Sequence, residues 1–360
     1  MVDPGFWRDR SVLVTGHTGF KGSWLAQWLD LMGARVSGLS LPGPHWAAVP
    51  ALVPPSPALR DLRADIRDLA ATLAGVQEAR PEVVLHLAAQ ALVRPSYADP
   101  LGAYAANVMG TAHVLEAVRR TPGVRAVLVV TSDKCYANRE WVWPYREDDP
   151  LGGHDPYSSS KACAELAAAA WRDSFFPPGR HAEHGVAVAT ARAGNVVGGG
   201  DWGGDRLVPD LVRAALAGQV TPIRSPGAVR PWQHVLDPLA GYLQLAERLV
   251  QDGPAAARAW NFGPLDTGAR TVGWIADRFC SLWGEGAAWS ADPGEHPHEA
   301  HFLKLDSSRA RWDLGWSPRL DVGQALEWSV DWYRACCAAP DSAGPMTREQ
   351  IGRYMETPAA

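Results

Sequence analysis

The chain has 360 residues, a net charge of -5 and a globular composition with 47% hydrophobic and 20% charged residues. This length suits one large domain or two medium ones, and the acidic balance argues against a nucleic-acid-binding protein. No apolar run approaches the roughly 18 residues of a membrane span, and the first residues lack the apolar core of a signal peptide. Five cysteines without C-x-x-C spacing are typical of reduced thiols, so a cytoplasmic location is expected.

The first half of the chain alternates short apolar runs with helical patterns. Strands are predicted at residues 11–15, 35–39, 83–87, 126–131 and 186–191. Helices are predicted at residues 23–32, from Asp65 as a capping residue, at 100–120 and at 157–173. Residues 42–58 are rich in proline and are expected to form an irregular excursion. The alternation is typical of an α/β protein with a Rossmann-type doubly wound parallel sheet.

A glycine loop lies between the first predicted strand and the first long helix. Gly16, Gly19 and Gly22 allow a tight turn and a close approach of the backbone to a pyrophosphate at the helix N-terminus. Lys21 is within reach of a phosphate. No acidic residue ends the second strand, so the sequence does not choose between NAD and NADP. The alternative is a glycine turn without a ligand.

The composition changes after residue 191, where glycine, proline and arginine become frequent. Residues 1–191 are predicted to form the Rossmann domain that binds the cofactor, and the chain is expected to return to it at 233–262. Residues 192–232 and 263–337 are expected to form a smaller substrate-binding domain. Residues 338–360 are predicted to be a polar tail, either mobile or docked.

Candidate catalytic residues follow the strand at 126–131 and begin the helix at 157–173. Tyr157 and Lys161 are four residues apart, so they share a helix face, and a lysine with a cationic nicotinamide ring favours the phenolate. With the Ser132 hydroxyl as a clamp, this set suits the oxidation of an alcohol. Asp133 and Lys134 add an acid and a base, which suggests a second reaction such as loss of water. The alternative for this pair is a surface ion pair.

Other polar and aromatic residues of the sequence suggest less specific roles. The planar guanidinium of arginine matches phosphate oxygens, so Arg192, Arg206, Arg224 and Arg230 are candidates for binding a diphosphate. Arg206 and Arg230 suit this role best. The alternative is that each is an ordinary surface arginine. His86 is more simply a satisfied core histidine than a site residue. The histidines at 296–301 lack metal-site spacing, so no metal is predicted. Four tryptophans in polar surroundings are candidates for lining a pocket, namely Trp141, Trp143, Trp202 and Trp232.

Seven runs, in order over nearly the whole chain, carry a more specific resemblance. They are TGHTGFKGSW (15–24), TSDKCY (131–136), GGHDPYS (152–158), RAGNVVGGGDW (192–202), RPWQHV (230–235), WNFGP (260–264) and PHEA (297–300). Together they resemble the CDP-glucose 4,6-dehydratases, a family of the extended short-chain dehydrogenase/reductase superfamily. The resemblance implies an NAD-dependent hydro-lyase that converts CDP-glucose to CDP-4-keto-6-deoxyglucose and water. Oxidation at C4, loss of water across C5 and C6, and return of the hydride to C6 are the implied steps.

The resemblance also implies a role for each catalytic candidate. Tyr157 is the base at the 4-hydroxyl, and Lys161 lowers its pKa and holds the nicotinamide ribose. Ser132 clamps the 4-oxygen, and Asp133 protonates the departing C6 hydroxyl. Lys134 stands where dTDP-glucose dehydratases carry a glutamate, the base at C5. Either Lys134 or a water removes the C5 proton.

Two sets of binding residues complete the expectation. NAD is expected to contact Gly16, His17, Thr18, Gly19, Phe20, Lys21, Gly22, Asp65, Ile66, Leu87, Ala88, Ala89, Gln90, Asn107, Tyr157 and Lys161. The nucleotide sugar is expected to contact Ser132, Asn195, Arg206, Arg230, His234 and Glu299, with Asn195 and Arg230 on the diphosphate. Relatives pair through helices beside the sheet, so a homodimer or homotetramer is expected by analogy.

Three other functions stay open at this point. A nucleotide-sugar 4-epimerase also oxidises C4, but it has no use for Asp133 and Lys134. A 4,6-dehydratase acting on another nucleotide sugar is the stronger alternative, because nucleobase contacts cannot be placed from sequence. A binding protein that senses NAD without catalysis is the third, and it would not need Tyr157 or Lys161.

Overall fold

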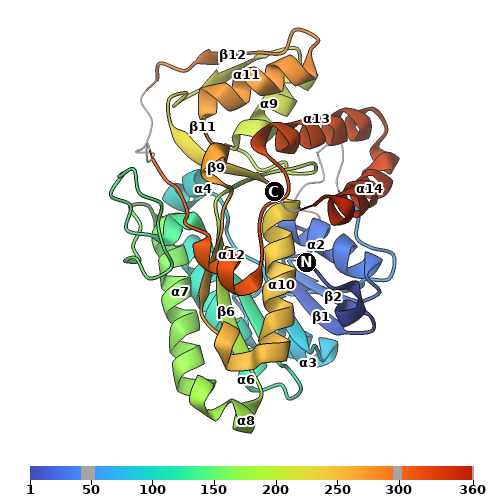
Figure 1. Ribbon diagram of the computed structural model, residues 1–360, viewed down its shortest axis with the longest axis vertical. Helices are drawn as coiled ribbons and strands as arrows, with labels where there is room; N and C mark the ends of the chain where they lie inside the picture. The colour runs from blue at the N-terminus through green and yellow to red at the C-terminus, as the bar shows by residue number, and fades with distance from the viewer. Residues whose placement is uncertain (42–52, 295–301, 359–360) are drawn as a thin grey trace.

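A computed structural model describes residues 1–41, 53–294 and 302–358, and its centre is a parallel sheet of seven strands (Figure 1). The strand order is β10-β6-β5-β4-β1-β2-β3, and every neighbouring pair is parallel. The strands are β1 (Ser11–Thr15), β2 (Arg35–Ser40), β3 (Arg60–Arg63), β4 (Val83–His86), β5 (Ala126–Val130), β6 (Ala187–Ala193) and β10 (Ala259–Phe262). The order reverses beside β1, which confirms the predicted Rossmann-type doubly wound sheet.

Helices cover both faces of the sheet because its strands are apolar on both sides. Along β1, Val12 and Val14 pack into one hydrophobic core and Leu13 into another. The first core includes side chains of α2 (Phe20–Leu31) and α10 (Leu236–Asp252). The second includes side chains of α3 (Leu69–Ala79), α6 (Gly110–Arg119) and α7 (Pro156–Phe175).

A smaller, mixed part of the chain lies over the carboxyl ends of the central strands (Figure 1). It contains a three-stranded sheet in the order β11-β9-β7 and a two-stranded sheet of β12 and β8. Its strands are β7 (Asn195–Val197), β8 (Val220–Ile223), β9 (Val229–His234), β11 (Ala269–Thr271) and β12 (Ala288–Ala291). Its helices are α9 (Leu207–Leu216), α11 (Val272–Trp283) and α13 (Val322–Ala338). The division into two domains at the predicted boundaries stays a prediction, although β10 does return to the central sheet.

The remaining helices are short or lie at the periphery. They are α1 (Pro4–Trp7), α4 (Val93–Ala98), α5 (Pro100–Tyr104), α8 (His181–His184), α12 (Ser308–Leu314) and α14 (Ala343–Glu356). The predicted tail is therefore a helix, and it docks, because the Arg348 guanidinium donates to Gln27 Oε1 at 2.9 Å and pairs with Asp30 on α2. No helix among the described residues is long and apolar enough to cross a membrane.

Two local predictions differ from the structure. Asp68, and not Asp65, caps α3, because the Asp68 carboxylate accepts from the amides of Ala70 and Ala71, whereas Asp65 binds Arg67. The helix expected over 100–120 is interrupted by a π-helical turn at Ala105–Met109. That turn contains Asn107, so the widened backbone coincides with a predicted site residue.

Candidate active site

The carboxyl ends of the central strands open into one large cavity of about 1830 Å³. Its walls come from the glycine loop, the ends of β4 and β5, the start of α7, and the segments around β7 and β9. This is the crevice at which doubly wound sheets bind their ligands. The volume exceeds that of an ordinary small-molecule pocket, so two ligands can lie in it together.

The glycine loop forms the floor of the cavity at the start of α2. Gly16 has a φ of 75°, and a Cβ there would lie 2.8 Å from the amide nitrogen of Ala88. A Cβ on Gly22 would lie 2.1 Å from the Gly16 carbonyl oxygen. Only glycine therefore permits this closed loop, which leaves the N-terminus of α2 accessible to an anion.

One predicted loop contact does not face the cavity. The His17 side chain is buried, with Nδ1 2.9 Å from Ser40 Oγ and Nε2 3.0 Å from an Asp61 oxygen. Burial lowers the pKa of His17. The ring thus joins the loop to β2 and β3, and His17 does not line the cavity.

The segment after β4 lines the cavity as predicted. The cavity lining includes Leu87, Ala88, Ala89 and Gln90, and also Asp65 and Ile66, which follow β3. Asn107 lies behind the wall: its amide oxygen accepts from Gln90 N at 2.9 Å, and its Nδ2 donates to Gln90 O at 3.0 Å and to Ser160 Oγ at 2.8 Å. Asn107 therefore fixes the Gln90 backbone to α7 without reaching the cavity.

His86 is a satisfied core histidine, as the simpler interpretation predicted. Its ring nitrogens lie 2.7 Å from Thr15 Oγ1 and 3.1 Å from Thr111 Oγ1. Burial lowers the pKa of His86 to about 3, so the ring is neutral.

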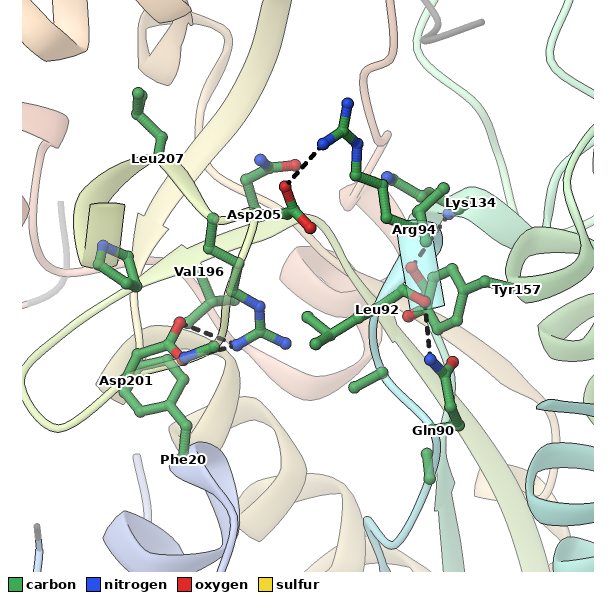
Figure 2. A pocket seen from close by; sticks show the side chains of 18 of the residues that line it. Phe20, Gln90, Leu92, Arg94, Lys134, Tyr157, Val196, Asp201, Asp205 and Leu207 are labelled. Carbon is green, nitrogen blue, oxygen red and sulfur yellow. Dashed lines mark hydrogen bonds and ion pairs between the residues drawn. The ribbon is translucent and has the colours of Figure 1, made fainter. Parts of the chain in front are cut away.

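The five predicted catalytic residues meet at the cavity wall between β5 and α7. Ser132 Oγ donates to Asp133 Oδ1 at 3.0 Å and is also a hydrogen-bond partner of Tyr157. Asp133 is 2% exposed, and its Oδ2 has no hydrogen-bond partner. Lys161 Nζ donates to the Val130 carbonyl at 3.3 Å. Figure 2 shows Tyr157 beside Lys134, both lining the cavity.

Burial governs the protonation of this cluster. Desolvation raises the pKa of Tyr157 to about 12, although the hydrogen bond with Ser132 lowers it. Desolvation likewise raises the pKa of Asp133, which favours the protonated carboxyl that an acid catalyst requires. It lowers the pKa of Lys161 to about 8. Without the cofactor, Tyr157 is therefore protonated at neutral pH, and its activation by Lys161 together with a cationic nicotinamide ring stays a prediction.

The predicted substrate contacts divide into three groups. Asn195, Arg206 and Arg230 line the cavity. Arg206 is engaged by Asp201, whose two carboxylate oxygens lie 2.8 Å from Arg206 Nη1. His234 does not line the cavity, because its buried ring packs edge-on against Trp24 and Trp328. Glu299 lies outside the described residues.

Two further sequence predictions are resolved by the packing. Arg192 is a structural residue, since its guanidinium lies 2.9 Å from Glu165 Oε2 and both side chains are buried. Of the four tryptophans, Trp232 lines the cavity, and Trp141, Trp143 and Trp202 do not. Among the described residues no group of three metal-ligating side chains is present, and the histidines at 296–301 lie outside them.

An ion-pair bridge at the cavity mouth was not foreseen. The Asp205 carboxylate lies 3.2 Å from the guanidinium of Arg94, in the first turn of α4 (Figure 2). It also lies 3.2 Å from the guanidinium of Arg224, which follows β8. The bridge joins α4 to the segments before α9 and after β8, and all three residues line the cavity. No sequence signal pairs Arg94 with residues more than 100 positions away, since the contact arises only from the tertiary fold.

Comparison with known proteins agrees with this geometry. Residues 12–263 match the model of the NAD dependent epimerase/dehydratase family. The chain belongs to this family. Among its members, the CDP-glucose 4,6-dehydratase of Salmonella typhimurium is 49% identical over 99% of both chains. The dTDP-glucose 4,6-dehydratase of Streptomyces antibioticus is 31% identical over 90% of this chain and 92% of its own.

A solved structure, MoeE5 in complex with UDP-glucuronic acid and NAD, has the same fold. It superimposes with a TM-score of 0.76 and 25% identity over 90% of this chain and 99% of its own. The seven-stranded parallel sheet of the present chain is therefore the fold of this NAD dependent epimerase/dehydratase family.

Proposed function

We propose that the protein is a CDP-glucose 4,6-dehydratase, which converts CDP-glucose to CDP-4-keto-6-deoxyglucose and water. The observation that carries this proposal is Asp133, a buried carboxyl with one unpartnered oxygen, held beside Ser132 and Tyr157. An epimerase needs no acid at this place. The relative with 49% identity over nearly the full length supports CDP-glucose as the substrate.

The cavity fits NAD as the cofactor. The closed glycine loop would bind the pyrophosphate at the α2 N-terminus, and Asp65 and Ile66, which line the cavity, would bracket the adenine. Leu87 to Gln90 would lie along the cofactor, with Lys161 at the nicotinamide ribose. Bound NAD would supply hydride transfer, with C4 of the sugar as the donor and C6 as the final acceptor.

The residues of the chain manage the protons of the reaction. Tyr157 removes the proton of the 4-hydroxyl while Ser132 holds the oxygen. The resulting 4-keto group acidifies C5, whose proton passes to Lys134 or to a water, and a proton from this base or from solvent returns to C5 when C6 receives the hydride. Asp133 gives its proton to the C6 hydroxyl, and the C6–oxygen bond breaks to release water. Asn195 and Arg230 hold the diphosphate. Arg206, whose guanidinium is paired with Asp201, contacts the nucleotide sugar as well.

Removal of the cofactor should expose the raised pKa of Tyr157. In cofactor-free protein, the wild-type minus Tyr157→Phe ultraviolet difference spectrum is expected to show no phenolate from pH 7 to about pH 10, since burial opposes the charge. Added NAD should bring phenolate absorbance into this range, because its cationic ring joins Lys161. Equal titrations with and without NAD would contradict the cofactor as the source of activation.

A homodimer is proposed from the apolar surface beside the sheet. Leu101 on α5 is 80% exposed. Met109, in the π-helical turn Ala105–Met109, and Leu166, on α7, are also exposed. These helices contact one another, so their exposed side chains can form one self-complementary patch. A cytoplasmic location also stays a prediction.

Charge placed on this patch should separate the subunits. We expect Leu166→Glu to lower the sedimentation-derived mass toward that of a monomer, because a buried unpaired carboxylate opposes association. Trp312→Glu is the matched control, since Trp312 is 90% exposed on α12, outside the patch. An unchanged mass for Leu166→Glu would locate the interface elsewhere.

The decisive experiment is an incubation with CDP-glucose in D₂O, with the product identified by mass and NMR. A 4-keto product lacking one water and carrying deuterium at C5 is expected. Conversion to CDP-galactose would replace the proposal with a 4-epimerase. Unchanged CDP-glucose with conversion of a dTDP-, GDP- or UDP-sugar would assign a 4,6-dehydratase of another nucleotide sugar.

A further inference from the structure

One face of α7 carries three side chains that bind the end of β5. Tyr157, Lys161 and Glu165 are spaced four residues apart, so they share this face. Tyr157 is a hydrogen-bond partner of Ser132, and Lys161 Nζ donates to the Val130 carbonyl at 3.3 Å. The third side chain, Glu165, is a buried carboxylate that the proposed mechanism does not use.

The Glu165 carboxylate accepts four hydrogen bonds from the end of β5 and from β6. Thr131 Oγ1 and Arg192 Nε donate to Oε1, the second at 2.9 Å. Thr190 Oγ1 and Arg192 Nη2 donate to Oε2 at 2.6 Å and 2.9 Å. Burial opposes the charge, but the Arg192 guanidinium outweighs burial and holds the pKa of Glu165 below its ordinary value. The carboxylate is therefore ionised at neutral pH.

The place of Thr131 in the chain gives this link a consequence for the site. A buried ion pair alone is weak evidence for stability, because well-packed apolar residues of similar volume often replace one without loss. The Thr131 amide donates to the Ala191 carbonyl of β6 at 2.9 Å, and the chain then enters the turn Asp133–Cys135, which Ser132 caps. Thr131 therefore fixes the point from which Ser132 and Asp133 extend toward the cavity.

We propose that Glu165 is a positioning residue for the oxidation at C4, which ties the end of β5 to α7 through Thr131 and so holds Ser132 against Tyr157. The inference rests on the proposed function, because it assumes Tyr157 as the base and Ser132 as the clamp of the 4-oxygen. Glu165 itself exchanges no proton and undergoes no covalent change. Its effect falls on the rate of oxidation, because the clamp and the base must be aligned with the same hydroxyl.

The test compares Thr131→Val with Thr190→Val in the NAD-loaded enzyme, with CDP-glucose as substrate. Each variant replaces a buried hydroxyl by a methyl group and removes one donor from the same carboxylate, so both should lower the melting temperature by similar amounts. Only Thr131→Val should slow the formation of bound reduced nicotinamide in a single turnover, by about tenfold, because only Thr131 precedes the clamp. Thr190→Val should keep the wild-type rate, and so should Thr131→Ser, which retains the hydroxyl.

The pH dependence of the oxidation is a second readout, which a merely structural role would not move. Burial raises the pKa of Tyr157, and the hydrogen bond with Ser132 opposes this. If Ser132 is displaced in Thr131→Val, the pKa rises further, and the acid limb of the rate profile should move to higher pH. Thr190→Val should leave the limb in place. Both variants keep the charged neighbours of Tyr157, which are Asp133, Asp155 and Arg206.

Several outcomes would overturn the proposal. Equal oxidation rates in Thr131→Val and Thr190→Val would leave Glu165 with a structural role only. Loss of bound dinucleotide from Thr131→Val, measured after denaturation, would assign the hydroxyl to cofactor retention. If Thr131→Val fails to fold, Thr131→Ala and Thr131→Ser differ only in the hydroxyl, and equal rates in that pair would overturn the proposal as well. Wild type without 4-keto product would mean that the proposed function itself had failed.

Discussion

A Tyr157→Phe variant is expected to lose dehydration by at least about 10³-fold and to form no bound reduced nicotinamide. The phenylalanine ring fills the same space, but no group remains to take the proton of the 4-hydroxyl. Every later step depends on the 4-keto group, so all of them stop with the first. Nicotinamide absorbance after mixing with CDP-glucose, together with product analysis, measures both effects.

The matched control for this substitution is Tyr97→Phe. Tyr97 lies on α4 and is exposed, and it does not line the cavity. It should keep wild-type turnover. Reduction of nicotinamide in Tyr157→Phe would show that another group acts as the base at C4.

Asp133→Asn should separate oxidation from elimination. An asparagine keeps the size of the side chain and an oxygen that can accept from Ser132, but it has no acidic proton to give. We expect C4 oxidation to persist while elimination slows by about 10²–10⁴. Reduced nicotinamide should therefore accumulate on the enzyme, which is the opposite of the Tyr157→Phe result.

The pH dependence distinguishes the acid from a passive hydrogen-bonding group. Burial raises the pKa of Asp133, so wild-type elimination should fall only as the pH rises through that raised value. Asp133→Asn should lose this decline. Full turnover in Asp133→Asn at neutral pH would remove Asp133 from the role of acid.

The central sheet was predictable because its strands are short apolar runs bounded by turns. The strand at β5 (Ala126–Val130) is apolar at every position, and a parallel sheet brings its end and the glycine loop to the same edge. Ser132 and Asp133 were predicted at this edge for this reason, and Tyr157 and Lys161 were predicted from their four-residue spacing on a helix. Their meeting follows from topology that local sequence specifies.

Contacts between distant segments were less predictable. The pairing of Arg206 with Asp201, the burial of His234 against two tryptophans and the bridge at Asp205 depend on how the smaller sheets fold over the cavity. Strands β7, β9 and β11 are short or irregular in sequence, so no periodicity identified them. The hydrogen bond from Lys21 to Tyr242 likewise joins residues more than 200 positions apart.

The docked C-terminal helix has a mechanical consequence. Within α14, Tyr354 donates to Asp237 of α10 at 2.8 Å, and Thr347 accepts from Trp332 of α13 at 3.0 Å. Arg348 binds α2, the helix that begins at the glycine loop. One helix therefore joins α2 and α10, which pack on the central sheet, to α13 of the smaller part of the chain. A movement between α13 and α10 at this point would have to break the buried hydrogen bonds of Tyr354 and Thr347, so we expect the relative motion of these helices to be small.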